Sequence, residues 1–232
     1  MSDPALEIQA LQKTFVLHAQ GGVRLPVLRG VSLRVAPGEC VVLADPSGAG
    51  KSTLLRAVYG NYVPQAGRIL VRHDDRMVDL VGASPRLVLD VRRRTIGYVS
   101  QFLRVVPRVP VVEVVAEPLR AIGVPLPQAR ERARTLLERL RIPERLWSLS
   151  PVTFSGGEQQ RVNVARVFVV AYPVLLLDEP TASLDAESRR LVVELIDEAR
   201  GRGAAVLGTV HDALVRSRLA TRVQWLTEPE AA

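Results

Sequence analysis

The sequence predicts a single α/β domain of 232 residues with an antiparallel β part at its N-terminus and an inserted helical subdomain. The first supporting observation is a phosphate-binding-loop pattern at residues 45–52, which follows an apolar run and precedes a helical pattern. The second is an apolar strand pattern at 174–177 that ends in two carboxylates. The third is a change at about residue 102, where prolines and an amphipathic helix replace the strand patterns.

Strand and helix patterns alternate along the rest of the chain. The expected elements before residue 102 are strands at 6–15, 27–35 and 40–44, a helix at 52–59, and strands at 68–72 and 96–100. The expected elements after residue 160 are a strand at 174–177, a helix at 186–200, and strands at 204–209 and 222–226. The α/β core is thus assigned to about 1–101 and 161–226, the helical subdomain to about 102–160 with a helix at 128–140, and a frayed tail to 227–232.

The composition argues against several classes of protein. The net charge of +7 raises the question of nucleic acid, but the basic residues are spread out, with one tight cluster at Arg92-Arg93-Arg94, and aromatic residues make up only 4%. We therefore expect no direct nucleic-acid binding. The N-terminus lacks a signal-peptide pattern and the longest apolar stretch is broken by Arg166 and Pro173, so no membrane span is expected. The single cysteine, Cys40, fits a buried strand and a reducing cytoplasm.

Lysine is nearly absent from the sequence, which draws attention to Lys51. Lys and Arg together number 31, and only Lys13 and Lys51 are lysines. A compact ammonium that reaches the β- and γ-phosphates in a tight loop cannot be replaced by a broad planar guanidinium. We therefore interpret Lys51 as functional.

The loop itself offers a cradle for phosphate. Successive backbone N–H groups at a helix N-terminus bind phosphate oxygens, and the hydroxyl of Ser52 is suited to Mg²⁺. The residues expected to bind the nucleotide here are Ser47, Gly48, Ala49, Gly50, Lys51, Ser52 and Thr53. The structural alternative is a glycine-rich turn that precedes a helix and binds nothing.

Asp45 departs from the phosphate-loop pattern, which has glycine at this position. A carboxylate about 5 Å from a phosphate charge costs roughly 3 kcal/mol at an effective dielectric constant near 20. Mg²⁺, Lys51 and an outward rotamer would reduce this repulsion. We therefore expect nucleotide binding to be weakened by Asp45 and not abolished.

The strand pattern Leu175-Leu176-Leu177 delivers Asp178 and Glu179 at its carboxyl end, where open α/β sheets bind their ligands. Asp178 is suited to the Mg²⁺ shell, and Glu179 is suited to polarise an attacking water as general base. The structural alternative is that Asp178 and Glu179 are two surface acids at the end of a strand, with no role in catalysis.

The segment Phe154-Ser155-Gly156-Gly157-Glu158-Gln159-Gln160-Arg161 has no ordinary structural explanation. It resembles the signature motif of the ATP-binding cassette family, and the motifs of this family follow in order over nearly the whole chain. The resemblance implies a P-loop NTPase core of the ABC ATPase type, with ATP and Mg²⁺ as cofactors and ATP hydrolysis as the activity.

The same resemblance implies roles for individual residues. Glu179, the switch histidine His211 and the Q-loop Gln101 would be catalytic, and Mg²⁺ would be bound by Ser52, Gln101 and Asp178. Further nucleotide contacts would come from Phe15, Ser155, Gly156, Gly157, Glu158 and the D-loop Asp185. In the family two cassettes pair head to tail, so the signature of one protomer caps the ATP of the other. The partner would be a second copy or a paralogous cassette.

Several stretches narrow the expected class of cassette. Residues 59–64, 98–108, 143–147 and 153–163 resemble the L subunit of the bacterial carbon–phosphorus lyase system. This resemblance implies a cytoplasmic ATPase subunit that partners the lyase core subunits. It would support formation of α-D-ribose 1-methylphosphonate 5-triphosphate in phosphonate breakdown.

Two alternatives remain open. One is the ATPase subunit of a membrane transporter, such as a lipoprotein-releasing or macrolide-type exporter. The other is a nucleotide-binding structural subunit that does not hydrolyse ATP. This alternative is considered because Asp45 replaces the first glycine of the phosphate-loop pattern. His18 and His73 match no motif and are expected to be solvated.

Overall fold

The computed structural model describes residues 3–46, 48–103 and 107–226. Ser47, part of the segment 98–108 and the tail 227–232, which was expected to fray, therefore lie outside the described residues.

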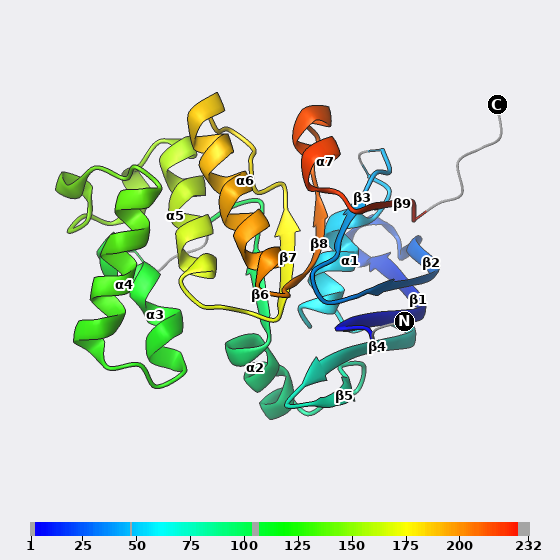
Figure 1. Cartoon of the computed structure of the whole chain (residues 1–232). Helices are drawn as coiled ribbons and strands as arrows, with labels where there is room; N and C mark the ends of the chain where they lie inside the picture. The colour runs from blue at the N-terminus through cyan, green and yellow to red at the C-terminus, as the bar shows by residue number, and fades with distance from the viewer. Residues whose placement is uncertain (1–2, 47, 104–106, 227–232) are drawn as a thin grey trace.

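A parallel sheet forms the centre of the domain (Figure 1). Its strands are, in spatial order, β6 (Ile96–Val99), β7 (Val174–Asp178), β8 (Ala205–Thr209), β3 (Cys40–Leu43) and β9 (Arg222–Gln224). Side chains of β3 alternate between two hydrophobic cores, with Cys40 and Val42 in one and Val41 and Leu43 in the other. Because both faces of the sheet are covered, the sequences of its central strands are continuous runs of apolar residues.

Helices cover the two faces of this sheet. On one face α1 (Lys51–Val58) packs with the N-terminal strands, and on the other lie α5 (Gly156–Phe168), α6 (Ala186–Gly201) and α7 (Ala213–Leu219). The parallel strands place their carboxyl ends at one edge, where α1 begins directly after the phosphate loop. The fold therefore positions the loop at the edge expected to bind ligand.

A second, antiparallel sheet is built mainly from the N-terminal part, in the order β2-β1-β4-β5. Its strands are β1 (Leu6–Leu17), β2 (Val23–Val35), β4 (Ala66–His73) and β5 (Arg76–Asp79). A short 3₁₀ helix, η1 (His18–Gln20), and Gly21 with its φ of 68° connect the first two strands. The expected N-terminal β part and the α/β fold are confirmed.

The region between β6 and β7 is helical. It contains α3 (Val111–Ala121), α4 (Leu126–Arg139) and the 3₁₀ helices η2 (Glu144–Leu146) and η3 (Pro151–Thr153), which lead into α5. Figure 1 shows α3 and α4 on the side of the parallel sheet opposite to the antiparallel sheet. Leu137 and Leu140 are fully buried in the core that these helices share with α5 and α6.

The expectation that His73 is solvated is wrong. Its side chain is 2% exposed, because α2 (Pro85–Arg94) packs beside the end of β4. The imidazole contacts the hydroxyl of Thr95 at 2.6 Å through Nδ1 and the carboxylate of Asp90 at 3.1 Å through Nε2. His73 is therefore a buried histidine with hydrogen-bonding partners on both ring nitrogens, whereas His18 is exposed as expected.

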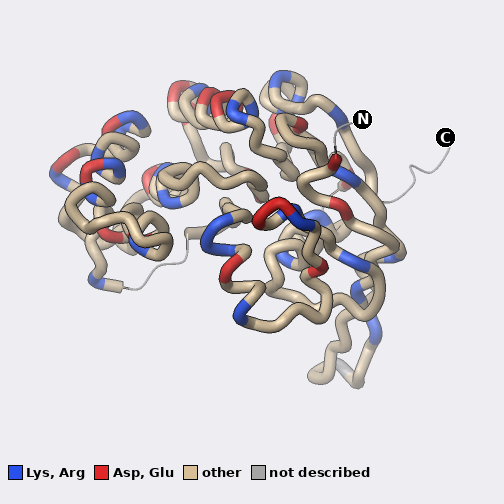
Figure 2. The backbone as a smooth tube through the Cα atoms, turned by 60° about the horizontal axis from the view of Figure 1, so that its bottom comes forward, with Lys and Arg blue, Asp and Glu red and all other residues tan. Residues whose placement is uncertain are grey.

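Charges of both signs are distributed over the surface. Figure 2 shows Lys and Arg residues interspersed with Asp and Glu on helices and strands throughout the chain. Among the described residues, no helix combines the length and the apolar character needed to cross a bilayer.

Candidate nucleotide site

The phosphate loop has the backbone that its glycines allow. Gly48 and Gly50 have φ of 86° and 94°, which L side chains rarely adopt. A Cβ at Gly50 would also lie 2.8 Å from Cγ1 of Val27, so this position admits only glycine. The ammonium of Lys51, which is 8% exposed, donates to the carbonyl oxygens of Asp45 and, at 2.7 Å, Pro46. Lys51 thus lies within the loop that it is expected to serve.

Asp45 has an acceptor role in the fold. Its side chain is 4% exposed, and Oδ2 accepts a hydrogen bond of 2.7 Å from the backbone N–H of Leu226. The neighbouring Ala44 N–H donates to the carbonyl of Gln224 at 3.1 Å. Asp45 is not among the residues with positive φ, so the backbone does not require glycine here. The aspartate therefore joins the phosphate loop to the segment after β9.

Asp178 forms the centre of the candidate magnesium site. It is 1% exposed, and its Oδ1 accepts from the hydroxyls of Ser52 at 2.9 Å and Thr209 at 3.2 Å. Its Oδ2 accepts from the hydroxyl of Tyr98 at 3.2 Å. In the described part of the chain its hydrogen-bond partners are thus neutral hydroxyls, so the buried negative charge favours a cation. Hard oxygen donors on Asp178 and Ser52 fit Mg²⁺.

Glu179 and His211 face each other beside this centre. The Nε2–H of His211 donates to Oε1 of Glu179 at 2.8 Å. The side chain of Glu179 is 24% exposed and that of His211 is 58% exposed, so both remain accessible to water. A carboxylate oriented by a histidine in this way is suited to accept a proton from water.

The backbone of Glu179 is held in an unusual conformation. Its φ is 55°, in the left-handed region that glutamate seldom adopts. Its N–H donates to Oγ1 of Thr209 at 3.0 Å, and its carbonyl accepts from Nε2 of the buried Gln160 at 3.3 Å. Such strain persists where neighbouring groups fix it, and it occurs at functional sites. Gln160 thereby connects the signature segment to the candidate base.

The signature segment begins helix α5. The side chain of Ser155 caps the helix by accepting from Glu158 N–H at 3.3 Å, and Glu158 Oε2 accepts in return from Ser155 N–H at 3.0 Å and its hydroxyl at 2.7 Å. The Ser155 hydroxyl, and then its N–H, hold the pKa of Glu158 below its usual value. Ser155 and Gly156 are exposed. The helix N-terminus is therefore open to an anion.

The D-loop lies against the signature. A Cβ on Gly157 would come within 3.0 Å of the carbonyl oxygen of Ser183, whose φ is 61°. Asp185 caps α6 by accepting from Ser188 N–H at 2.7 Å. The expected nucleotide role of Asp185 stays a prediction, because its carboxylate is engaged in this cap.

The other predicted residues are placed as follows. Phe15 lies on β1, with its ring 5.2 Å from that of Tyr62 in an edge-on arrangement. Thr53 follows Ser52 in α1. Gln101 follows β6, and no hydrogen bond joins it to Ser52 or Asp178, all three of which are described residues. The metal-binding and catalytic roles of Gln101 remain predictions.

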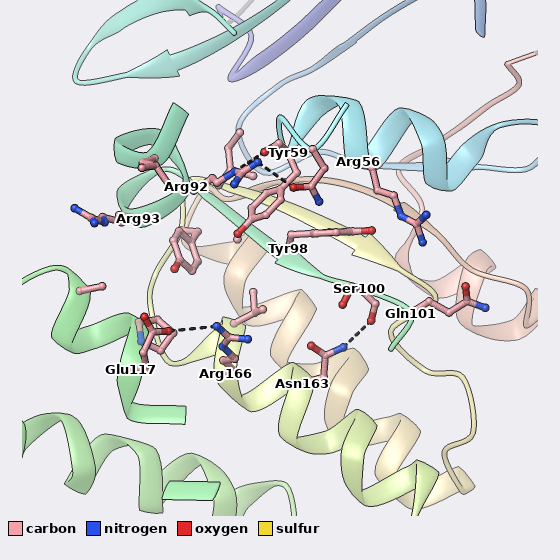
Figure 3. Close-up of a pocket in the computed structure, with 18 of the residues that line it drawn as sticks. Arg56, Tyr59, Arg92, Arg93, Tyr98, Ser100, Gln101, Glu117, Asn163 and Arg166 are labelled. Carbon is pink, nitrogen blue, oxygen red and sulfur yellow. Dashed lines mark hydrogen bonds and ion pairs between the residues drawn. The ribbon is translucent and has the colours of Figure 1, made fainter. Parts of the chain in front are cut away.

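A cavity of about 600 Å³ adjoins this site. It lies between α1, α2, β6, α3 and α5, and its lining includes Arg56, Tyr59, Tyr98, Gln101, Phe102 and Arg166. Figure 3 shows Tyr98, Ser100 and Gln101 along one segment at the edge of the cavity. Phe102 is 70% exposed. The cavity was not predicted from the sequence, because its walls come from segments far apart in the chain.

Sequence reasoning missed three residues of the site itself. Tyr98 and Thr209 donate to Asp178, and Gln160 binds the backbone of Glu179. Thr209 could have been found, since it ends β8 beside the end of β7 and parallel strands bring their carboxyl ends together.

The fold and the site define a nucleotide-binding α/β ATPase with a phosphate loop and an adjacent acidic strand end. The family model for the ABC transporter matches residues 28–182, and the chain belongs to this family. It is therefore an ATP-hydrolysing cassette that uses ATP and Mg²⁺.

Curated relatives resemble the chain over most of its length. The lipoprotein-releasing system ATP-binding protein LolD of Maricaulis maris is 43% identical over 221 residues, covering 94% of this chain and 93% of the relative. Its counterpart from Ruegeria pomeroyi is 41% identical over 220 residues, covering 94% and 93%. The arginine transport ATP-binding protein ArtP of Haemophilus influenzae is 36% identical over 199 residues, covering 85% and 81%.

Solved cassettes share the fold. A bacterial ABC transporter cassette solved as a dimer has a TM-score of 0.86 and 27% identity, covering 95% of this chain and 93% of that one. A post-hydrolysis cassette dimer with ADP and Pi has a TM-score of 0.85 and 28% identity, covering 96% and 94%. The relatives correct the expected assignment to carbon–phosphorus lyase, which they do not support, and favour the transporter alternative.

Proposed function

We propose that this chain is the ATP-binding subunit of a membrane transporter of the lipoprotein-releasing type. The observation that carries the proposal is the similarity to lipoprotein-releasing ATP-binding proteins, which reaches 43% and extends over more than nine tenths of both chains. The aligned part covers 94% of this chain, so it extends well beyond the nucleotide motifs. It therefore supports a shared type of partner in addition to a shared ATPase site.

In this proposal each part of the site has one task. The amides of Gly48 to Gly50 and the Lys51 ammonium bind the phosphates, and Ser52 with Asp178 provides oxygen ligands for Mg²⁺. Glu179 accepts the proton of the attacking water, and His211 orients its carboxylate. Magnesium, when bound, would neutralise charge on the phosphate oxygens.

We further propose that the site is completed by a second cassette. The exposed Ser155 and Gly156 lie at the N-terminus of the 13-residue helix α5, where an anion from outside the protomer would replace the Glu158 carboxylate as the acceptor of the Ser155 hydrogen bonds. The dimeric cassette that shares this fold supports a head-to-tail pair. Binding of ATP between two protomers would then make hydrolysis depend on pairing.

The cavity beside Gln101 is the proposed docking site for the membrane partner. It carries the basic residues Arg92 and Arg93 on α2 and the exposed ring of Phe102. A cytoplasmic segment with apolar and acidic side chains complements such a lining. Because Gln101 and Tyr98 also line the cavity, a docked segment would touch residues adjacent to the nucleotide site.

Co-purification tests the proposed function. The tagged chain, co-expressed with the membrane subunits of a lipoprotein-releasing system from a related bacterium, is expected to retain them in detergent. Phe102→Asp is expected to abolish this retention and leave ATP binding unchanged. Val63→Asp serves as the matched control, because Val63 is similarly exposed at 72% and lies outside the cavity lining.

The opposite result would overturn the assignment. If the chain, offered the membrane subunits together with carbon–phosphorus lyase core proteins, retained only the lyase proteins, the proposed function would be overturned. Equal loss of the membrane subunits in both variants would remove the cavity from the docking role.

A further inference from the structure

Tyr98 stands between the cavity and the candidate magnesium site. It lies on β6, which pairs with β7, and its ring lines the cavity and packs against Tyr59 with 5.1 Å between the ring centroids. Its hydroxyl reaches Oδ2 of Asp178 at 3.2 Å. Figure 3 shows the phenol extending from the cavity wall, with the Arg56 side chain beside its hydroxyl.

The direction of the Tyr98 hydrogen bond follows from its neighbours. The carboxylate of Asp178 has only acceptor atoms, so the phenol must donate its proton to it. Arg56 has only donor groups, and it lies beside the hydroxyl of Tyr98 (Figure 3) while its Nη1 donates to the hydroxyl of Tyr62 at 3.3 Å. The hydroxyl of Tyr98 is therefore fixed as a donor towards Asp178.

The two oxygens of Asp178 have separate partners as a result. Oδ1 accepts from Ser52 and Thr209, and Oδ2 accepts from Tyr98. A carboxylate held at one oxygen cannot rotate freely about its bond to Cβ, so the other oxygen keeps its direction. Tyr98 thus helps to fix the plane of the carboxylate, in which one oxygen lies beside the Ser52 hydroxyl.

We propose that Tyr98 is a positioning residue of the magnesium site, which holds Oδ2 of Asp178 so that Oδ1 stays directed towards Ser52. The inference rests on the magnesium roles proposed above for Ser52 and Asp178. Residues that hydrogen-bond to metal ligands from outside the coordination shell typically change metal affinity about 10- to 100-fold when they are removed. Tyr98 is not required for binding the phosphates themselves, which the loop contacts directly.

The test compares nucleotide affinity with and without the metal. Calorimetric titration with a non-hydrolysable ATP analogue, in Mg²⁺ and then in EDTA, gives the factor by which Mg²⁺ strengthens binding. Tyr98→Phe is expected to reduce this factor by about tenfold and to leave the affinity in EDTA unchanged. Phenylalanine retains the packing against Tyr59, and the unfolding temperature confirms that the variant is folded.

Two further variants separate the outcomes. Tyr172→Phe removes another hydroxyl from the cavity lining. Because Tyr172 makes no hydrogen bond to Asp178, although the structure describes both residues, this variant is expected to leave the strengthening of binding by Mg²⁺ unchanged. Asp178→Asn is expected to reduce it strongly. If Asp178→Asn reduces the factor and Tyr98→Phe does not, the positioning role is overturned. If neither variant changes it, the proposed magnesium role of Asp178 is overturned together with that of Tyr98.

Discussion

The carboxylate of Asp45 accepts a hydrogen bond from the backbone N–H of Leu226, with 2.7 Å between Oδ2 and N. The residue that departs from the phosphate-loop pattern is therefore bound to the segment that follows the last strand, β9. This contact gives Asp45 a structural reason to be present. The effect of the Asp45 charge on ATP affinity is separate from this contact, and substitutions at position 45 can measure it.

Asp45→Asn and Asp45→Gly separate the charge from the hydrogen bond. Asparagine keeps an acceptor oxygen for Leu226, so we expect its stability to be unchanged and its ATP affinity to rise about fivefold, or about 1 kcal/mol, because a screened negative charge beside the phosphates is removed. Glycine loses the hydrogen bond, which should lower the free energy of unfolding by about 1–2 kcal/mol. Titration calorimetry and urea unfolding measure the two effects. An ATP affinity in Asp45→Asn equal to that of the natural chain would show that the charge is without consequence.

Glu179→Gln is expected to slow ATP hydrolysis at least about 10²- to 10⁴-fold, because an amide cannot accept the proton of the attacking water. ATP affinity should stay within about twofold, since the phosphates are bound by the loop. Phosphate release under saturating Mg²⁺ and ATP measures turnover. Turnover equal to that of the natural chain would remove Glu179 from the role of base.

His211→Ala is expected to reduce turnover by about tenfold or more and to leave ATP binding unchanged. The reason is the 2.8 Å hydrogen bond that orients the Glu179 carboxylate. His211→Gln, which can still donate a hydrogen bond, should retain more activity than the alanine variant. If both variants hydrolysed ATP at the natural rate, His211 would have no positioning role.

Cys40 is expected to be inert to thiol reagents in the folded protein. Its side chain is 2% exposed, and burial raises the pKa of the thiol to about 12. Because the pKa is raised in the fold, Cys40 does not affect stability below its unfolded pKa of about 8.5 and destabilises the fold increasingly above it. Maleimide labelling at pH 8 should therefore be slow in buffer and rapid in urea. Rapid labelling without urea would show that the hydrophobic core around Cys40 on β3 is open to the reagent in the folded protein.

Features set by neighbouring residues could be predicted from the sequence. The glycines of the phosphate loop, the carboxylates after the apolar strand and the signature segment each depend on a short local pattern. Helix α2 could also have been found, because Ser84 caps it and Pro85 occupies its first position. The sequence pattern did not indicate this helix clearly, since half of its 10 residues are charged.

Features that join distant segments could not be predicted. Asp45 and Leu226 are 181 residues apart, and Tyr98 and Asp178 are 80 apart. The burial of His73 likewise depends on Asp90 and Thr95, which α2 and its end bring to β4. The assignment to carbon–phosphorus lyase was made from local resemblance and was not supported, because motifs around the nucleotide are shared across cassettes with different partners.

The molar mass of Glu179→Gln in the presence of ATP tests the central claim most directly, namely that the exposed signature of one protomer completes the ATP site of another. With Mg²⁺ and saturating ATP, light scattering is expected to give twice the monomer mass, and without ATP the monomer mass. Ser155→Arg in the same background should bind ATP and stay monomeric, because a bulky side chain blocks the signature. A Glu179→Gln protein that remains monomeric while saturated with ATP would contradict the account.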